Sequence, residues 1–181
     1  MAALIGVSRE KAAEVVEKHR GDGVLEAANF NAPDQVVISG HLEPVNRVVE
    51  AFKDERRARA VMLPVSSAFH TSLMEPAQQA LRARLENVTA KPSRFPVLAN
   101  VSAQPYPSDE QGIHQLLVNQ VVSPVLWEDC VKNMIQAGAE IFLEVGPGKV
   151  LTGLLRRIDR KAVGIGISDL QSIRAFVEGN P

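Results

Sequence analysis

The sequence has few of the features that mark secreted, membrane-spanning or nucleic-acid-binding proteins. Cys130 is the only cysteine in 181 residues, which excludes an internal disulfide and a metal site made of several cysteines. No run approaches the roughly 18 consecutive apolar residues of a transmembrane helix. The formal net charge of -1 gives no basic face for nucleic acid. The first residues also lack the basic start and long apolar core of a secretory signal, so we expect a cytoplasmic protein.

The common catalytic signatures are missing as well. The chain contains no G-x-S-x-G serine elbow, no H-E-x-x-H and no C-x-x-C, so no motif predicts a metal or a bound cofactor. Composition is that of an ordinary globular protein, with 45% hydrophobic and 23% charged residues. The length allows one well-buried domain or two small ones.

Residues 1–63 predict a ferredoxin-like β-α-β-β-α-β subdomain. Ser8 is a plausible N-cap for the first helix, and the apolar residues of the second follow the spacing of one helical face. The expected strands are 3–7, 24–29, 35–39 and 59–63, and the expected helices are 8–20 and 42–57.

Residues 64–181 predict the incomplete, doubly wound parallel sheet of a larger α/β domain. Strands are expected at 97–101, 141–145 and 163–167, fewer than the typical five or six. We expect capping boxes at Ser72–Glu75 and Ser108–Gln111 to start two of its helices. So small a sheet cannot cover its own edges, which predicts self-association or a partner. The chain also begins within an expected core strand, as a piece of a longer protein would.

Among four histidines, His70 is the best candidate for a catalytic base. It ends a loop between a strand and a helix, where catalytic groups tend to be displayed, although position alone fits a structural role equally well. His19 and His114 lie within expected helices among polar neighbours, and we interpret both as solvated side chains. His41 stands at a helix entrance and is interpreted as a local cap.

Two other segments have a plain and a functional interpretation. Gly146–Gly148 precedes a helix and could offer backbone N–H groups to an anion, but such turns more often dock a helix against a sheet. Asn29 and Asn31 flank an aromatic residue at a strand end, where short amides commonly form turns. The residues alone therefore indicate an α/β protein with a candidate histidine base.

Four blocks carry a family resemblance: NFNAPDQVVISG at Asn29–Gly40, PVSSAFHTSLM at Pro64–Met74, NQVVSPVLW at Asn119–Trp127 and EVGPGKVLTG at Glu144–Gly153. They resemble, in the same order, segments of malonyl-CoA:acyl-carrier-protein transacylases of fatty acid synthesis and of polyketide synthase acyltransferase domains. The resemblance covers nearly the whole chain.

The resemblance implies ping-pong acyl transfer without a cofactor. A serine takes malonyl from its coenzyme A thioester, and the acyl group then passes to the phosphopantetheine thiol of acyl carrier protein. His70 matches the family's base, and Gln120 matches the residue whose backbone carbonyl orients that imidazole. A neutral acceptor there fixes the tautomer without a full negative charge beside the base.

Three further residues match the family's substrate cleft. Phe69 matches an aromatic residue that accompanies selection of malonyl over methylmalonyl groups, by steric exclusion worth roughly 1–3 kcal/mol. Ordinary packing is an equal alternative for this ring. Asn29 and Asn31 match polar residues near the acyl-CoA site.

The family's serine elbow and the arginine that binds the malonate carboxylate are not found in these 181 residues. We therefore expect the chain alone to be inactive or nearly so. Three interpretations stay open: a C-terminal fragment of the transferase, one half of a split enzyme that pairs with a separate N-terminal half, or a non-catalytic module that binds carrier protein or another protein.

Overall fold

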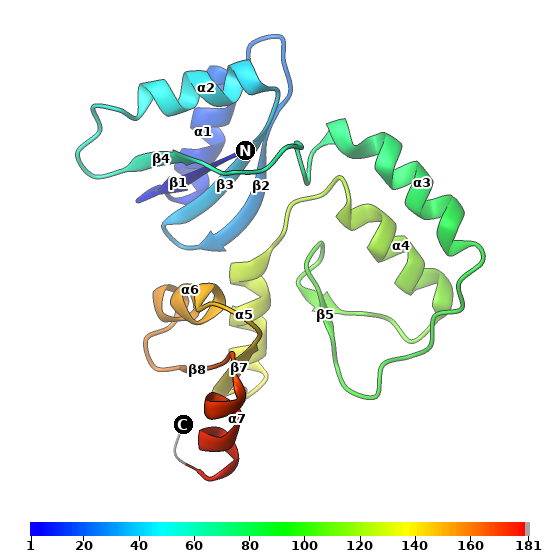
Figure 1. Ribbon diagram of the computed structural model, residues 1–181. Coiled ribbons are helices and arrows are strands. Elements are labelled where there is room, and N and C mark those ends of the chain that lie inside the picture. The colour runs from blue at the N-terminus through cyan, green and yellow to red at the C-terminus, as the bar shows by residue number, and fades with distance from the viewer. Residues whose placement is uncertain (180–181) are drawn as a thin grey trace. The chain divides into compact units, whose positions relative to one another are not determined.

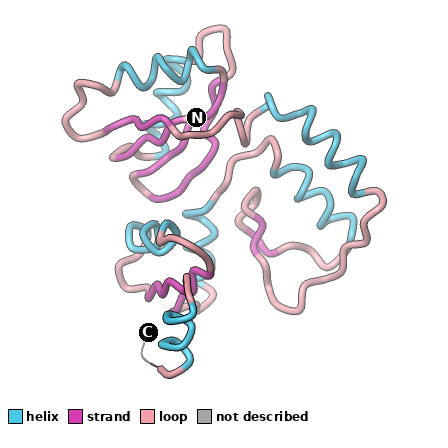
Figure 2. Tube along the Cα trace, in the orientation of Figure 1, coloured by secondary structure: helices cyan, strands magenta, loops and turns pink. Residues whose placement is uncertain are grey.

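The computed structural model describes residues 1–179 and divides into two compact units, Met1–Cys130 and Val131 onward (Figures 1 and 2). Helix α5 (Trp127–Gln136) runs across the boundary. The other elements of the first unit are β1 (Ala2–Ile5), α1 (Arg9–His19), β2 (Leu25–Ala32), β3 (Gln35–Gly40), α2 (Leu42–Ala51), β4 (Arg59–Met62), the 3-10 helix η1 (Ser72–Met74), α3 (Glu75–Leu85), β5 (Leu98–Ala99), β6 (Gln104–Pro105) and α4 (Glu110–Gln120).

A four-stranded antiparallel sheet forms the core of residues 1–63. Its strand order is β2-β3-β1-β4, and β1 pairs with both β3 and β4. Helices α1 and α2 pack on this sheet, and their buried side chains meet those of the central strands (Figure 1). The largest fully buried apolar side chains of this core are Leu4, Ile38, Val36, Val45 and Val48.

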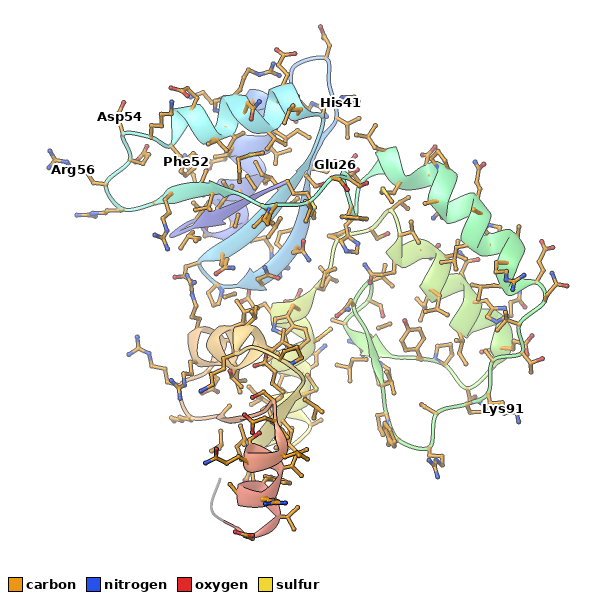
Figure 3. All side chains as sticks on the ribbon, viewed as in Figure 1. Glu26, His41, Phe52, Asp54, Arg56 and Lys91 are labelled. Carbon is orange, nitrogen blue, oxygen red and sulfur yellow. The ribbon has the colours of Figure 1, made fainter. Side chains whose placement is uncertain are left out.

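The two helices begin where the sequence places them, but α2 is shorter than expected. Ser8 caps α1 by accepting a hydrogen bond from the Lys11 N–H at 3.3 Å, as predicted. Helix α2 ends at Ala51 rather than near residue 57. Phe52 still packs against the core, but residues 53–57 are all charged and have no apolar face to bury. Figure 3 shows Asp54 and Arg56 pointing outward from this loop.

The exposed edge of β2 carries a second attachment, which matters for the candidate site. The Val125 N–H donates to the Ala28 carbonyl at 2.8 Å, and the Phe30 N–H donates to the Val125 carbonyl at 2.9 Å. Asn29 and Val125 form an isolated parallel bridge. Strand β2 therefore holds the segment that follows α4.

Both expected capping boxes are wrong. Ser72 lies in the 3-10 helix, and its hydroxyl bonds Glu26 instead of capping a helix that contains Glu75. The N-cap of α4 is Asp109, one residue beyond Ser108, and it accepts from the Gly112 N–H at 2.7 Å. A carboxylate is the stronger acceptor of the two neighbours, which accounts for the one-residue shift.

The segment expected as strand 97–101 contains only the two residues of β5. It pairs antiparallel with β6, because the chain reverses at Ala103, which adopts a positive φ of 56°. The Ala103 N–H closes this turn by donating to the Ala99 carbonyl at 2.8 Å. In the sheets of the described residues, the segment thus has an antiparallel partner instead of the expected parallel one.

The second unit has the parallel pairing that the sequence predicts. It contains β7 (Ile141–Val145), α6 (Val150–Ile158), β8 (Val163–Ile167) and α7 (Leu170–Val177), and β7 pairs in parallel with β8. Ile141, Leu143 and Val145 alternate along β7 and are all exposed, Val145 by 77%. An apolar strand face of this kind is unusual on a monomer, so self-association or a partner stays a prediction.

The Gly146–Gly148 turn precedes a helix whose first N–H groups already have an acceptor. The Glu144 carboxylate accepts from the Leu151 N–H at 2.9 Å and from the Thr152 N–H at 2.8 Å. These backbone bonds hold the pKa of Glu144 below its usual value. Glu144, a residue of the same chain, therefore already occupies two of the N–H donors that an anion would need at this helix start.

We predict that Glu144→Gln reduces the acid sensitivity of folding. A carboxyl whose folded pKa is depressed stabilises the protein above its unfolded pKa near 4.5 and loses that contribution as pH falls through the folded pKa. Wild type should thus lose more unfolding free energy than Glu144→Gln between pH 5 and pH 3, by denaturant titration. Parallel curves for wild type, Glu144→Gln and the surface control Glu17→Gln would contradict this role.

Ser39 yields a second prediction on stability. Its side chain is fully buried on β3, and its Oγ has no hydrogen-bond partner among the described residues. An unpaired buried hydroxyl costs free energy, so Ser39→Ala should raise the unfolding free energy by about 1 kcal/mol. Ser8→Ala removes an N-cap and should lower it by about 1 kcal/mol. Thermal unfolding of both variants checks the opposite signs, and destabilisation by Ser39→Ala would overturn the prediction.

Candidate active site

His70 is held in a strained backbone conformation at the end of the loop that follows β4. Its φ is 61°, in the left-handed region that side-chain-bearing residues seldom adopt. Such strain costs roughly 1–3 kcal/mol and persists only where neighbouring contacts enforce it. One of these contacts is local: Thr71, fully buried, donates its hydroxyl to the Ala68 carbonyl at 2.7 Å.

The half-buried imidazole of His70 lies against the C-terminal end of α4. Its Nδ1 is 3.1 Å from the backbone carbonyl oxygen of Gln120, the last residue of that helix, across 50 residues of sequence. The last carbonyls of a helix have no intrahelical donor, so this oxygen is available to the ring. A carbonyl only accepts, which places the ring proton on Nδ1 and leaves the Nε2 lone pair able to take a proton.

The Gln120 side chain braces the turn behind this carbonyl. Its Nε2 donates to the Ser123 carbonyl at 3.0 Å and lies 3.5 Å from the His70 Nδ1. Because Nδ1 is the donor to the backbone carbonyl, the longer approach of two N–H groups is not a second bond. The Gln120 Oε1 is buried without a partner among the described residues.

The other predicted site residues lie on two neighbouring segments. Phe69 directly precedes His70, and 41% of it is exposed. Asn29 and Asn31 are half-buried on β2, and Asn29 forms the bridge to Val125. The structure thus brings His70 and Gln120 into contact and places Asn29 beside the segment that follows Gln120. No hydrogen bond within residues 1–179 joins either asparagine to the His70–Gln120 pair.

Sequence reasoning missed a carboxylate that lies next to this loop. Glu26, on β2, accepts from the Ser72 hydroxyl at 2.6 Å and from the Ser72 N–H at 3.3 Å (Figure 3). The two residues are 46 positions apart, and the sequence gives no local signal for their meeting. The sequence predicts Ser72 only as a helix cap, and the structure shows no such cap.

The other three histidines lie outside the contact between His70 and Gln120, and each has its own local environment. His41 is the N-cap residue of α2, as predicted, but its side chain makes no capping bond to that helix; its Nδ1 instead accepts from the Val24 N–H at 3.0 Å. Burial, followed by the charges of Lys18 and Arg47, lowers the pKa of His19. The His114 Nε2 is buried without a partner within the described chain, so solvation of that atom is a wrong expectation.

Neither a metal cluster nor a membrane span is found in residues 1–179. These residues contain no group of three or more His, Cys, Asp or Glu side chains that could hold a metal ion. None of their helices is long and apolar enough to cross a membrane. The buried Cys130 thiol, whose pKa burial raises to about 11, is a poor nucleophile at neutral pH.

Comparison with known proteins identifies the class. The profile of the family described as "Acyl transferase domain" matches residues 3–170. The chain belongs to this acyl transferase family.

Individual relatives narrow the similarity to one kind of transferase. The chain is 36% identical over 179 residues to a malonyl CoA-acyl carrier protein transacylase of Bacillus subtilis, and the match covers 98% of this chain. A solved acyl-carrier-protein S-malonyltransferase of Burkholderia pseudomallei has a TM-score of 0.91 at 38% identity, over 98% of this chain and 57% of that one. A malonyl-transacylase solved in complex with its type II polyketide acyl-carrier protein has a TM-score of 0.93 at 34% identity, over 99% and 58%.

The predicted resemblance to malonyl transacylases is therefore confirmed. The chain spans 56% of the length of the Bacillus subtilis relative and a similar share of the solved structures.

Proposed function

We propose that this chain carries the histidine part of a malonyl-CoA:acyl-carrier-protein transacylase site. The observation that supports this most directly is the 3.1 Å contact between the His70 Nδ1 and the Gln120 carbonyl oxygen. It gives the ring the tautomer that a general base needs, because Nδ1 carries the proton and Nε2 is able to accept one. The names of the relatives supply the acyl donor and the acceptor.

In this proposal His70 moves one proton in each half of the reaction. Its Nε2 takes the proton of a serine hydroxyl as the serine oxygen attacks the malonyl thioester carbon, and the coenzyme A thiolate leaves with that proton. It then takes the proton of the phosphopantetheine thiol as the sulfur attacks the malonyl-serine ester, and the serine oxygen leaves with that proton. The Gln120 carbonyl keeps the ring oriented while it is positively charged.

The nucleophile comes from outside these 181 residues, which contain no G-x-S-x-G. A base without a nucleophile does not form an acyl-enzyme. We therefore propose that the chain alone is inactive, and that transfer in the cytoplasm requires a polypeptide that brings the serine. Residues 1–63, with their β-α-β-β-α-β order, are proposed as the ferredoxin-like subdomain, and residues 64–181 as part of the large domain.

Reconstitution tests this function. The chain is mixed with a separately expressed segment of a relative that carries its serine elbow, and malonyl transfer from malonyl-CoA to acyl carrier protein is measured. We expect no transfer by either part alone and measurable transfer by the mixture. His70→Ala should reduce the reconstituted rate by about 10²–10⁴-fold, the usual contribution of a general base.

His19→Ala is the matched control, because that ring lies at the end of α1 and makes no contact with Gln120. It should leave the reconstituted rate within about twofold of wild type. Full transfer by the pure chain, or equal rates for His70→Ala and wild type, would contradict the proposed function. The second result would instead favour a non-catalytic carrier-binding module.

Phe69 is proposed to exclude branched acyl groups. Phe69 directly precedes His70, and 41% of the residue is exposed, so packing within the chain does not bury it fully. Phe69→Ala should raise the ratio of methylmalonyl to malonyl transfer in the reconstituted site by about tenfold. A competition assay with both thioesters measures the ratio, and Leu73→Ala, a neighbouring exposed apolar residue, is the control. An unchanged ratio would indicate that Phe69 has only a packing role.

A further inference from the structure

We infer that Glu26 is a positioning residue for the catalytic histidine: through Ser72 its carboxylate fixes the loop that presents the His70 ring to the Gln120 carbonyl. This inference rests on the proposed function of His70 and adds a residue to that site. Glu26 belongs to β2, and the hydrogen bonds of its carboxylate go to Ser72 and not to the His70 ring, so we infer that it acts through the loop.

The contact between Glu26 and Ser72 consists of two hydrogen bonds to one carboxylate oxygen and is not an ion pair. One oxygen of Glu26 receives both the hydroxyl of Ser72, at 2.6 Å, and its backbone N–H, at 3.3 Å. Hydrogen bonds to an ionised acceptor are short and about twice as strong as neutral ones. The N–H belongs to the first residue of η1, a position that has no intrahelical acceptor. Glu26, on β2, thereby caps the 3-10 helix η1.

Strand β2 gives this anchor a rigid base. Glu26 lies opposite Ser39 in the register of β2 with β3, on an edge strand of the four-stranded sheet. Figure 3 shows Glu26 beside the loop that leads into α3. A carboxylate on a paired strand has little freedom to follow a shifting loop, so the loop is held in place relative to the sheet.

Only Thr71 separates the anchored Ser72 from His70. Thr71 is fully buried and its hydroxyl bonds the Ala68 carbonyl, so the loop is closed on both sides of His70. The positive φ of His70 needs such closure, because a non-glycine residue tends to relax out of that region. Release of Ser72 removes the outer half of the restraint and lets the ring turn away from its acceptor.

The same strand also holds the acceptor side. Residues Ala28 and Phe30 of β2 bond Val125 at 2.8 and 2.9 Å, five residues beyond Gln120. Between them, Gln120 is tied to Ser123 by its side chain at 3.0 Å. Strand β2 therefore sets the distance between base and acceptor from both ends. On the acceptor side it uses backbone groups, and on the histidine side it uses a side chain, which mutation can remove.

The test reads the tautomer of His70 in the intact chain. Ring nitrogen NMR of the chain labelled with 15N-histidine at neutral pH gives the ratio of Nε2–H to Nδ1–H, and His70→Gln assigns the signal among the four histidines. Glu26→Ala should raise this ratio about threefold to tenfold, as expected when one hydrogen bond's support is lost. Ser72→Ala removes the hydroxyl bond but keeps the backbone N–H bond to Glu26, so it should give a smaller change in the same direction. The double variant should give no more than Glu26→Ala alone.

Two controls separate positioning from general stability. Glu26→Gln keeps an acceptor oxygen, so its ratio should fall between those of wild type and Glu26→Ala. Glu43→Ala removes a carboxylate that pairs with Arg47 on α2, and it should leave the ratio unchanged. Thermal unfolding of every variant is recorded beside the spectra.

An unchanged tautomer ratio in both Glu26→Ala and Ser72→Ala would overturn the inference, whatever happens to stability. Changes that add in the double variant would overturn it as well, because the two residues would then act separately. A wild-type ring already protonated on Nε2 would be a different failure, since it removes the proposed base itself. If Glu26→Ala does not fold, the tautomer ratio of Ser72→Ala alone still tests the inference.

Discussion

One hydrogen bond organises the candidate site: the imidazole N–H of His70 donates to the carbonyl at the end of α4. A helix end offers this oxygen because its last carbonyls lack intrahelical donors. The acceptor is neutral, so the ring is oriented without a buried carboxylate and its desolvation cost. The helix dipole also places partial negative charge near this ring, which would favour the positive ring that the proposed proton transfer requires.

That bond depends on β2, an edge strand of the small sheet. Its backbone holds Val125, which follows the acceptor, and its Glu26 holds Ser72, which follows the donor. Two loops from distant parts of the sequence are thus attached to the same strand. The strained φ of His70 is the expected consequence of a ring that neighbouring contacts hold away from the conformation to which the chain would relax.

Local physics accounts for what the sequence predicted correctly. The periodic apolar residues of α1 and α2 and the Ser8 cap use neighbours within one turn, and each element of residues 1–63 forms near its expected place. The errors come from competition between close alternatives. Asp109 displaced Ser108 as a cap, and Glu26 took the hydroxyl that was expected to cap a helix at Ser72.

The sequence predicted only some of the residues of the candidate site. His70 could be singled out by its loop, but Gln120 entered through family resemblance, because a backbone carbonyl has no residue signature. Glu26 could not be found, since its partner lies 46 residues away and neither residue type is unusual there. Long-range contacts of this kind depend on the register of a sheet, which one sequence does not reveal residue by residue.

The position of one proton tests this account most directly. In the unmodified chain at neutral pH, we predict a His70 ring proton on Nδ1 that exchanges slowly with water and shows nuclear Overhauser contacts to amide protons at the end of α4. A ring protonated on Nε2, with no such contacts, would show that the carbonyl of Gln120 does not orient this histidine.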